Sequence, residues 1–455
     1  MLKFGRNRHI MQLALLFVFV FASPSQADTI SYKGVVQDAL QYSARIRVKA
    51  EDIQISDAIY RQNYAGLYPE ITAVSRFEKH ENLDTRGTGI NTINGEVVGG
   101  DQSAWRSSAY LMGQYSFSNW YKKSFEVDYY ERLRDVRVFE LDIEAKKVLK
   151  EITDVFGALA ECRIKLQYGA EILKRLQEVL YLKKQANALG QASYEEILKL
   201  EADIAALEKE AGAVRKEFQE NLERLFSYTG KAYNEEMGIE FLAAADQRQP
   251  PDYTRLIEET PEYKAKVKEL EAVKFKSKAA SNNFWPDVSL YGRYDFYGAN
   301  QDGLDYALRD FRQTAYSAGI MISLPLFDGG VRKWDRVRNL LEIRKQDETI
   351  KAVVEEKSRD IRTLQAGYSE LQKSLAHYRK LTDQYGKMLD ITKKAQGLGE
   401  RSLMDIRELE KDALTVERDW KVAEQSLAVY ERRIMLETDY SKFISEHNGN
   451  WSYQH

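Results

Sequence analysis

The sequence predicts a mainly α-helical protein with a small β part, built twice from one unit of helix, two strands, long helix and shorter helix. Two observations support this fold class. The first is the placement of proline, because segments 70–249 and 326–455 contain none, as very long helices require. The second is an internal repeat with a period of roughly 210 residues.

The repeat consists of three motifs that recur in the same order. They are YPEI at 68–71 and WPDV at 285–288, AYxxG at 109–113 and 315–319, and LGxxSxxxIxxLE at 189–201 and 398–410. One such pair could arise by chance. Three pairs in order, at a nearly constant offset, indicate an internal duplication.

Residues 1–27 are predicted to be a signal peptide. Lys3, Arg6 and Arg8 form a basic region, an apolar run follows at 13–22, and Ser25-Gln26-Ala27 fits a small-x-Ala cleavage site. The apolar run is too short for a transmembrane helix. No cysteine follows the cleavage site, so a lipid anchor is not supported.

The first structural repeat is assigned to 28–249. Its predicted elements are a helix at 35–66, strands at 69–78 and 104–117 around a polar loop at 81–103, a long helix at 121–188, a helix at 193–228 and a linker from 230. Apolar residues from Ile152 to Leu180 step alternately by three and four, which is a heptad seam. Cys162 lies on this seam, which indicates a packing role.

The second structural repeat is assigned to 250–455. Its predicted elements are a helix at 254–284, strands at 286–297 and 313–324 around a loop at 298–312, a long helix at 331–396, a helix at 402–445 and a C-terminal tail. Pro325 ends the last strand, and Asp328, Gly329 and Gly330 form a strand-to-helix corner. Gly190 and Gly399 mark the turns of two helical hairpins.

Lengths and alternation constrain the shape. Each long helix spans about 100 Å at 1.5 Å per residue, and the two shorter helices of each repeat could stack end to end beside it. Residues 316–324 alternate between an apolar face and a face of small residues. Four such strands cannot close a membrane barrel alone, so they form either a water-soluble sheet or one part of a barrel shared by several chains. The alternation favours the shared barrel.

Composition excludes several classes of function. The chain has 67 Lys and Arg against 70 Asp and Glu, a net charge of −3, which becomes about −6 without the signal peptide and argues against a nucleic-acid partner. Phosphate-loop, nucleophile-elbow and HExxH motifs are absent from the sequence. The single cysteine and five histidines offer neither an internal disulfide nor a metal-ligand cluster. We expect no cofactor and no enzymatic activity.

The SLPLFDGG corner at 323–330, the duplicated plan and the paired LGxxS turns resemble the TolC-type outer-membrane channel family, the outer membrane factors. The resemblance implies a homotrimer in the outer membrane of a Gram-negative bacterium, with a long periplasmic part. Twelve strands would form one transmembrane β-barrel and twelve stacked helices a coiled-coil tunnel. Such a channel is passive and works with a periplasmic adaptor and an inner-membrane transporter, either an ABC or a proton-driven pump. It exports small molecules (efflux) or proteins (type I secretion).

The resemblance also implies a periplasmic gate at the hairpin tips. By motif alignment Arg401 matches the gate arginine, Asp405 and Glu408 the acidic rings, and Glu196 their carboxylate partner, whereas Gln396 replaces the gate tyrosine. The residues themselves allow another interpretation. Ser193-x-x-Glu196 and Ser402-x-x-Asp405 fit capping boxes that serve their own helices, and Glu408 fits a solvated face.

A second class of function is a soluble periplasmic coiled-coil adaptor or scaffold. An adaptor usually carries one helical hairpin between β-rich domains. Here the hairpin is duplicated and the strands lie opposite its turns, which favours the channel.

Overall fold

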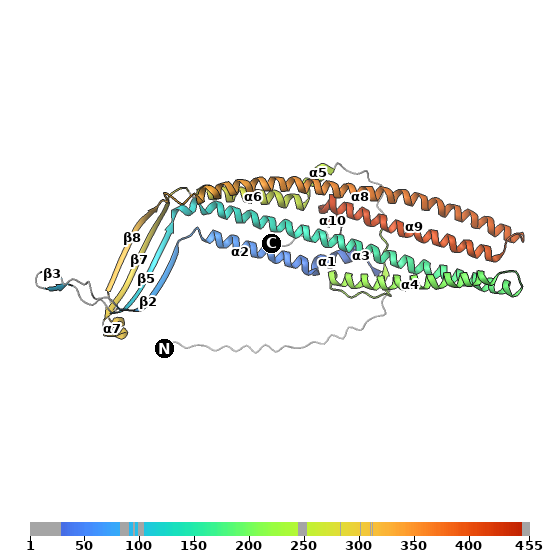
Figure 1. Cartoon of the computed structure of the whole chain (residues 1–455), viewed down its shortest axis with the longest axis horizontal. Helices are drawn as coiled ribbons and strands as arrows, with labels where there is room; N and C mark the ends of the chain where they lie inside the picture. The colour runs from blue at the N-terminus through green and yellow to red at the C-terminus, as the bar shows by residue number, and fades with distance from the viewer. Residues whose placement is uncertain are drawn as a thin grey trace.

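A computed structural model describes residues 29–81, 91–93, 96–98, 104–243, 253–282, 284–300, 302–309, 311 and 313–447. The predicted signal peptide, most of the loop predicted at 81–103 and the C-terminal tail beyond residue 447 lie outside these residues. The molecule is long and narrow, with a four-stranded sheet at one end and two helical hairpin turns at the other (Figure 1). The predicted fold class, mainly α with a small β part, is confirmed.

The four-stranded sheet is antiparallel, and its order is β2-β5-β7-β8. Its strands are β2 (Glu70–His80), β5 (Ala104–Ser116), β7 (Asp287–Asn300) and β8 (Gln313–Ser323). Two small sheets pair β1 (Thr29–Ile30) with β6 (Gly238–Ile239) and β3 (Asn91–Ile93) with β4 (Glu96–Val98). Within the described chain, β2 and β8 each have a neighbour on one side only.

The register gives the sheet two different faces. Tyr316 pairs with Tyr294, and Ile320 with Leu290, so the apolar side of β8 continues across the sheet. The exposed large side chains of this apolar face are Ile71, Phe77, Leu111, Leu290, Tyr294, Phe296, Tyr316, Ile320 and Ile322. The opposite face is polar, and on it Arg293 lies over the ring of Tyr110 and pairs with Asp295 at 2.6 Å.

The helices are α1 (Tyr32–Tyr42), α2 (Ala44–Ala65), η1 (Phe117–Trp120), α3 (Lys123–Ala188), α4 (Tyr194–Thr229), α5 (Tyr253–Glu259), α6 (Pro261–Asn282), α7 (Leu304–Arg309), α8 (Val331–Gly397), α9 (Leu403–Thr438) and α10 (Tyr440–His447).

Four expectations differ from these bounds. The helix expected at 35–66 is two helices, α1 and α2, which break at Ser43, where ψ is 120°. The helix expected at 254–284 is α5 and α6, with Pro261 at the first position of α6. The helix expected at 402–445 is α9 and α10, which break at Asp439. The loop expected at 298–312 contains the end of β7 and the short helix α7.

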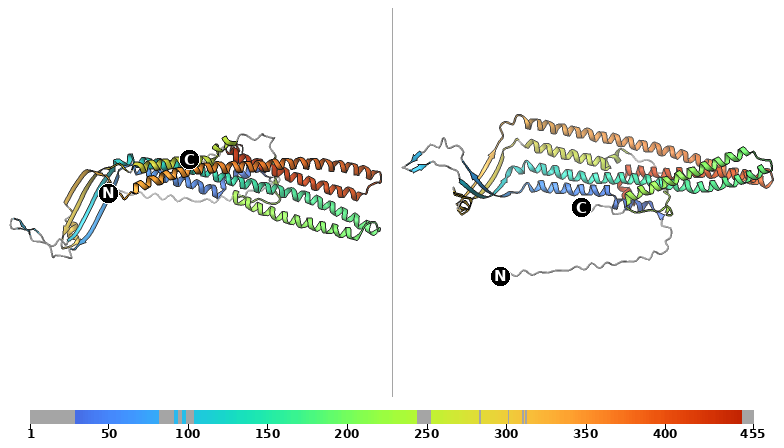
Figure 2. Two further views of the ribbon diagram at one scale, coloured as in Figure 1. Left: turned by 45° about the horizontal axis from the view of Figure 1, so that its top comes forward. Right: turned by 60° about the horizontal axis from the view of Figure 1, so that its bottom comes forward.

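The helices lie side by side in a fixed order. The helices α6 and α9 both contact α3 and α8, and α2 and α4 contact α3 (Figures 1 and 2). Figure 1 shows α9 and α6 following one another along the molecule, which is the end-to-end stacking that the lengths suggested. The linker after α4 is fixed to α9, because the Gln425 amide accepts from Leu242 N at 2.8 Å and donates to Leu242 O at 3.1 Å.

The core follows α3. Nineteen residues of α3 are buried, and on it Ile152, Val155, Leu159 and Cys162 of the predicted seam lie inside the main apolar cluster. The packing role of Cys162 is therefore confirmed. The nearly equally long α8 buries only Asn339 and Ile361.

Candidate functional site

The strand-to-helix corner is held by the side chain of Asp328. Its carboxylate accepts from Gly330 N at 2.9 Å, from Arg332 N at 3.1 Å and from Arg332 Nε at 2.6 Å. Arg332 also donates to the carbonyl of Pro325 at 2.7 Å. Hydrogen bonds, first of all that from the Arg332 side chain, lower the pKa of Asp328. Gly329 and Gly330 have φ of 68° and 87°, a left-handed backbone that favours glycine.

The two hairpin turns have the same backbone geometry. Gly190 and Gly399 have φ of 72° and 78°. In the first turn Gln191 N donates to Ala186 O at 2.9 Å and Gly190 N to Asn187 O at 2.9 Å. The second turn repeats this pair of bonds, since Glu400 N donates to Ala395 O at 3.0 Å and Gly399 N to Gln396 O at 2.9 Å. Both are Schellman motifs. Gln396 contributes its backbone carbonyl, and its side chain is exposed.

The acidic residues after the turns differ in their local roles. Asp405 forms a complete capping box, because its carboxylate accepts from Ser402 N at 2.9 Å and its own N–H donates to Ser402 Oγ at 3.1 Å. Glu196 N donates to Ser193 Oγ at 3.2 Å, but the Glu196 carboxylate points to a lysine instead. The capping alternative therefore holds fully for Asp405 and only in part for Glu196.

Lys183 brings the two hairpin tips together. Its Nζ lies 3.6 Å from Glu196 Oε2 and 3.4 Å from Glu408 Oε1, so one ammonium on α3 joins acids from α4 and α9. Sequence analysis missed Lys183, because a lone lysine near a helix end carries no motif.

A second ionic layer lies further from the turns. Arg175 and Glu178 on α3 face Arg407 and Glu410 on α9, with Arg407 to Glu178 at 2.8 Å and Arg175 to Glu410 at 3.3 Å. The seam between α3 and α4 is different, because it is closed by the apolar cluster of Ile172, Leu176, Val179 and Leu200. Near the tips, therefore, both apolar packing and ion pairs join the helices, since Met404 and Leu414 of α9 also pack against this cluster and Lys184 pairs with Glu201 of α4 at 2.7 Å.

Arg401 is exposed and forms no ion pair with a described residue of its own chain. The predicted gate residues are thus not assembled within this single chain. Glu196 and Glu408 meet at Lys183, Asp405 caps its helix, and Arg401 and Gln396 point their side chains into solvent.

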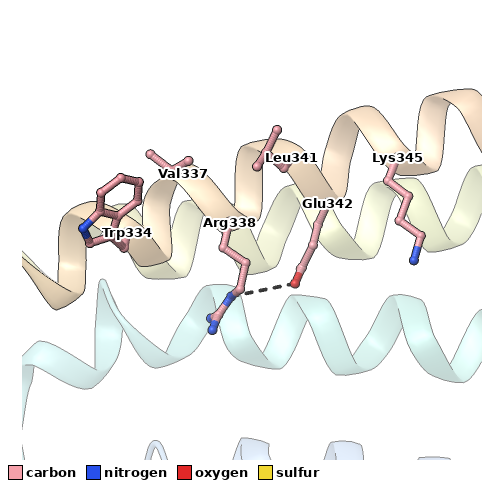
Figure 3. Close-up of a pocket in the computed structure, with 6 residues that line it drawn as sticks. All are labelled: Trp334, Val337, Arg338, Leu341, Glu342 and Lys345. Atoms are coloured by element: carbon pink, nitrogen blue, oxygen red, sulfur yellow. Dashed lines mark ion pairs between the residues drawn. The ribbon is translucent and has the colours of Figure 1, made fainter.

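An apolar groove runs along α8 near the sheet. It is lined by Trp334, Val337, Arg338, Leu341, Glu342 and Lys345, and Val337 and Leu341 lie on the side of α8 away from the neighbouring helices (Figure 3). Arg338 pairs with Glu342 at 3.8 Å. On the opposite side of the molecule α2 exposes Val48, Ile55 and Ile59.

Within the described residues, no group of three or more His, Cys, Asp and Glu side chains is arranged to hold a metal ion. None of the described helices is both long and apolar enough to cross a membrane.

The family model of the outer membrane efflux proteins matches residues 253–435, which run from α5 to near the end of α9. This part of the chain is similar to the outer membrane efflux proteins. The family resemblance found in the sequence is thereby confirmed for these residues. No curated protein matches the sequence.

Solved structures show the same fold over nearly the whole chain. The CmeC outer membrane channel of Campylobacter jejuni is 15% identical, with a TM-score of 0.73 over 93% of this chain and 90% of that chain. VceC of Vibrio cholerae is 17% identical, with a TM-score of 0.70 over 88% and 95%. CusC is 12% identical, with a TM-score of 0.75 over 90% and 91%. This similarity extends the shared fold to the first repeat.

Proposed function

We propose that this chain is an outer membrane efflux protein and forms one subunit of a homotrimeric channel-tunnel. The proposal rests on one observation. The sheet and the helical part of the chain both lack a neighbour, and they lack it on the same two sides of the molecule. The tunnel would be passive and would lead from the periplasm through the outer membrane.

The sheet supports the assembly through its open edges. The polar groups along the free edges of β2 and β8 would be unsatisfied in lipid, and the apolar face of the sheet is exposed. Pairing β8 of one subunit with β2 of the next removes both edges. Three subunits then give a closed barrel of twelve strands, with the apolar face toward lipid and the polar face toward the lumen.

The helices support the proposed trimer because apolar side chains are exposed in stripes on both sides of the chain. Trp334 and Leu341 on α8 lie close to the sheet end, at about the level of Ile55 and Ile59 on α2. Near the turns α8 exposes Leu381, Met388 and Ile391, while α4 exposes Tyr194 and Leu198. An α8 stripe packed between subunits against α2 and α4 would bury these side chains.

The assembly can be tested by membrane fractionation and by native mass measurement in detergent. We expect a protein that fractionates with the outer membrane and has three times the mass of one chain. Leu341→Cys combined with Ile55→Cys should give cross-links between subunits, because the only native cysteine is buried. A monomer that is soluble without detergent would reject the channel and favour the periplasmic adaptor or scaffold.

In the trimer the hairpin tips would form the periplasmic gate. Three copies of Glu196, Gln396, Arg401, Asp405 and Glu408 would lie near the axis. The exposed Arg401 would then find its acidic partner on a neighbouring subunit. Lys183 supports this arrangement, because it holds the two acidic tips of each subunit together.

Energy and specificity would come from partners. We propose that the tips dock to a periplasmic adaptor, and that an inner-membrane ABC or proton-driven transporter supplies the substrate. The exported substrate is a small molecule or a protein. The loops beside the outer ends of the strands, 81–103 and 298–312, would face the outside of the cell.

A further inference from the structure

The short helix α7 is seated on the sheet by a buried hydroxyl. Ser107 on β5 is 1% exposed, and its Oγ donates to the carbonyl of Ala307 at 2.8 Å. Ala307 is fully buried. Ser107 pairs across the sheet with Gly298, whose carbonyl lies 3.4 Å from the same hydroxyl. Ser107 and Gly298, two small residues on neighbouring strands, thus leave a space on the sheet that α7 occupies. We call this position the seat of α7.

The seat lies on the apolar face of the sheet. Ser107 and Gly298 share that face with Leu111, Tyr294 and Phe296 by the strand register. Phe311, which follows α7, stacks on Phe296 with ring centroids 6.1 Å apart. The connection between β7 and β8 therefore folds back over β7 and β5 on the apolar side, away from the polar face.

The seat also lies at the outer limit of the apolar face. From Leu290 to Gly298 the strand rises about 26 Å at 3.3 Å per residue. A strand tilt of about 40° reduces this to about 20 Å along a barrel axis, close to the roughly 25 Å apolar band of membrane barrels. Figure 1 places α7 at the end of the sheet far from the helices.

We propose that α7 is an interfacial helix that lies among the phosphate-bearing lipid headgroups of the outer leaflet. This inference rests on the proposed barrel and its lipid-facing apolar side. Tyr306 and Leu308 are exposed on α7, and the Arg309 guanidinium lies 5.7 Å from the Tyr306 ring centroid. Tyrosine is enriched at the membrane–water interface, and arginine is suited to binding phosphate. Because Ser107 donates to the Ala307 carbonyl, α7 also satisfies a hydroxyl that would otherwise face lipid.

Site-directed nitroxide labelling tests the depth of α7. Tyr306→Cys is the test position, Tyr316→Cys the control on the apolar face and Ser317→Cys the control on the polar face. Native Cys162 should not react, because it is 1% exposed and burial raises its pKa to about 11. Each labelled protein is placed in vesicles of phosphatidylcholine and phosphatidylglycerol, and collisions with oxygen and with a water-soluble nickel chelate are measured.

We expect strong oxygen contact at position 316, strong nickel contact at 317, and an intermediate ratio at 306 that corresponds to headgroup depth. Nickel contact at 306 equal to that at 317, with 316 in lipid, would overturn the placement of α7 alone. A label at 316 that is open to nickel would instead overturn the barrel.

The seat is tested by Ser107→Val in the Tyr306→Cys background. The valine removes the donor to Ala307 O and fills the space beneath α7, so the label at 306 should become mobile and open to nickel. The label at 316 should not change, and Ser107→Thr, which keeps the hydroxyl, should restore part of the immobility. An unchanged label at 306 in Ser107→Val would show that this seat does not position the helix.

Discussion

Replacing Glu437 by glutamine should strongly destabilise the protein, because this carboxylate holds a buried charge cluster together. Glu437 lies in the last turn of α9 and is 4% exposed. It pairs with Lys146 at 2.7 Å, with Lys357 at 3.3 Å and with Lys150. Lys146 and Lys357 also hold Glu262, at 3.0 and 2.6 Å, in the first turn of α6. The cluster thus joins four helices where α9 ends and α6 begins.

The size of the expected loss in unfolding free energy follows from the burial of Glu437. Glu437→Gln leaves three ammonium groups beside one carboxylate, and breaking a buried pair from one side costs about 3–5 kcal/mol. Burial first, and then the neighbouring Lys146 and Lys357, lower the pKa of Lys150 to about 7. Lys150 can therefore lose its proton at pH 8 and relieve the repulsion. At pH 5.5 it stays charged, so the repulsion is not relieved. The loss of stability caused by Glu437→Gln should thus grow as the pH falls.

The assay is denaturant unfolding in detergent, followed by circular dichroism at pH 8 and pH 5.5. The matched control is Glu424→Gln on the same helix, whose exposed carboxylate pairs with Lys421 at 3.0 Å; this change should cost at most about 1 kcal/mol. Adding Lys150→Met to Glu437→Gln should recover much of the loss. If Glu437→Gln costs no more than the control at either pH, the cluster does not stabilise the joint.

Three further outcomes are expected. Arg401→Ser should raise single-channel conductance in a planar bilayer, whereas an unchanged conductance in a folded trimer would leave Arg401 as a surface residue near a turn. Asp405→Ala with Glu408→Ala should weaken block by multivalent cations, and should also cost about 0.5–2 kcal/mol because the cap at Asp405 is lost; unchanged block would leave only the capping role. Burial raises the pKa of Asp142 to about 6, so the folded protein loses stability as the pH rises from about 4 to 6. Asp142→Asn should therefore stabilise the protein at pH 7 by roughly 2–3 kcal/mol and flatten that dependence in unfolding measured from pH 4 to 8.

The sequence predicted the features that depend on repeated local patterns. The turns at Gly190 and Gly399 were found because a left-handed Schellman position requires glycine in both copies. The seam through Cys162 was found because a heptad repeat shows in sequence. The corner at Asp328 was found because proline and paired glycines mark it.

The features that were missed depend on contacts between distant segments. The helix break at Ser43 has no proline or glycine to mark it. The helix α7 is only six residues long, and it is positioned by a hydrogen bond from Ser107, almost 200 positions earlier in the chain. Lys183 and Lys146 find their partners on other helices, so no local spacing reveals them. Ionic clusters of this kind can be predicted only after the helices have been placed side by side.

The comparison of α3 with α8 supports the proposed assembly of several copies of the chain. The duplication made two helices of nearly equal length, yet α3 buries 19 residues and α8 two. In its own chain α3 has neighbours on both sides, whereas α8 has them on one. The strands follow the same order, since β2, β5, β7 and β8 continue α2, α3, α6 and α8, so the free edge of β8 lies on the same side as the free face of α8. An interface that joins this side to the opposite side of the next subunit is head-to-tail, and such an interface closes into a ring when the rotation between subunits allows it.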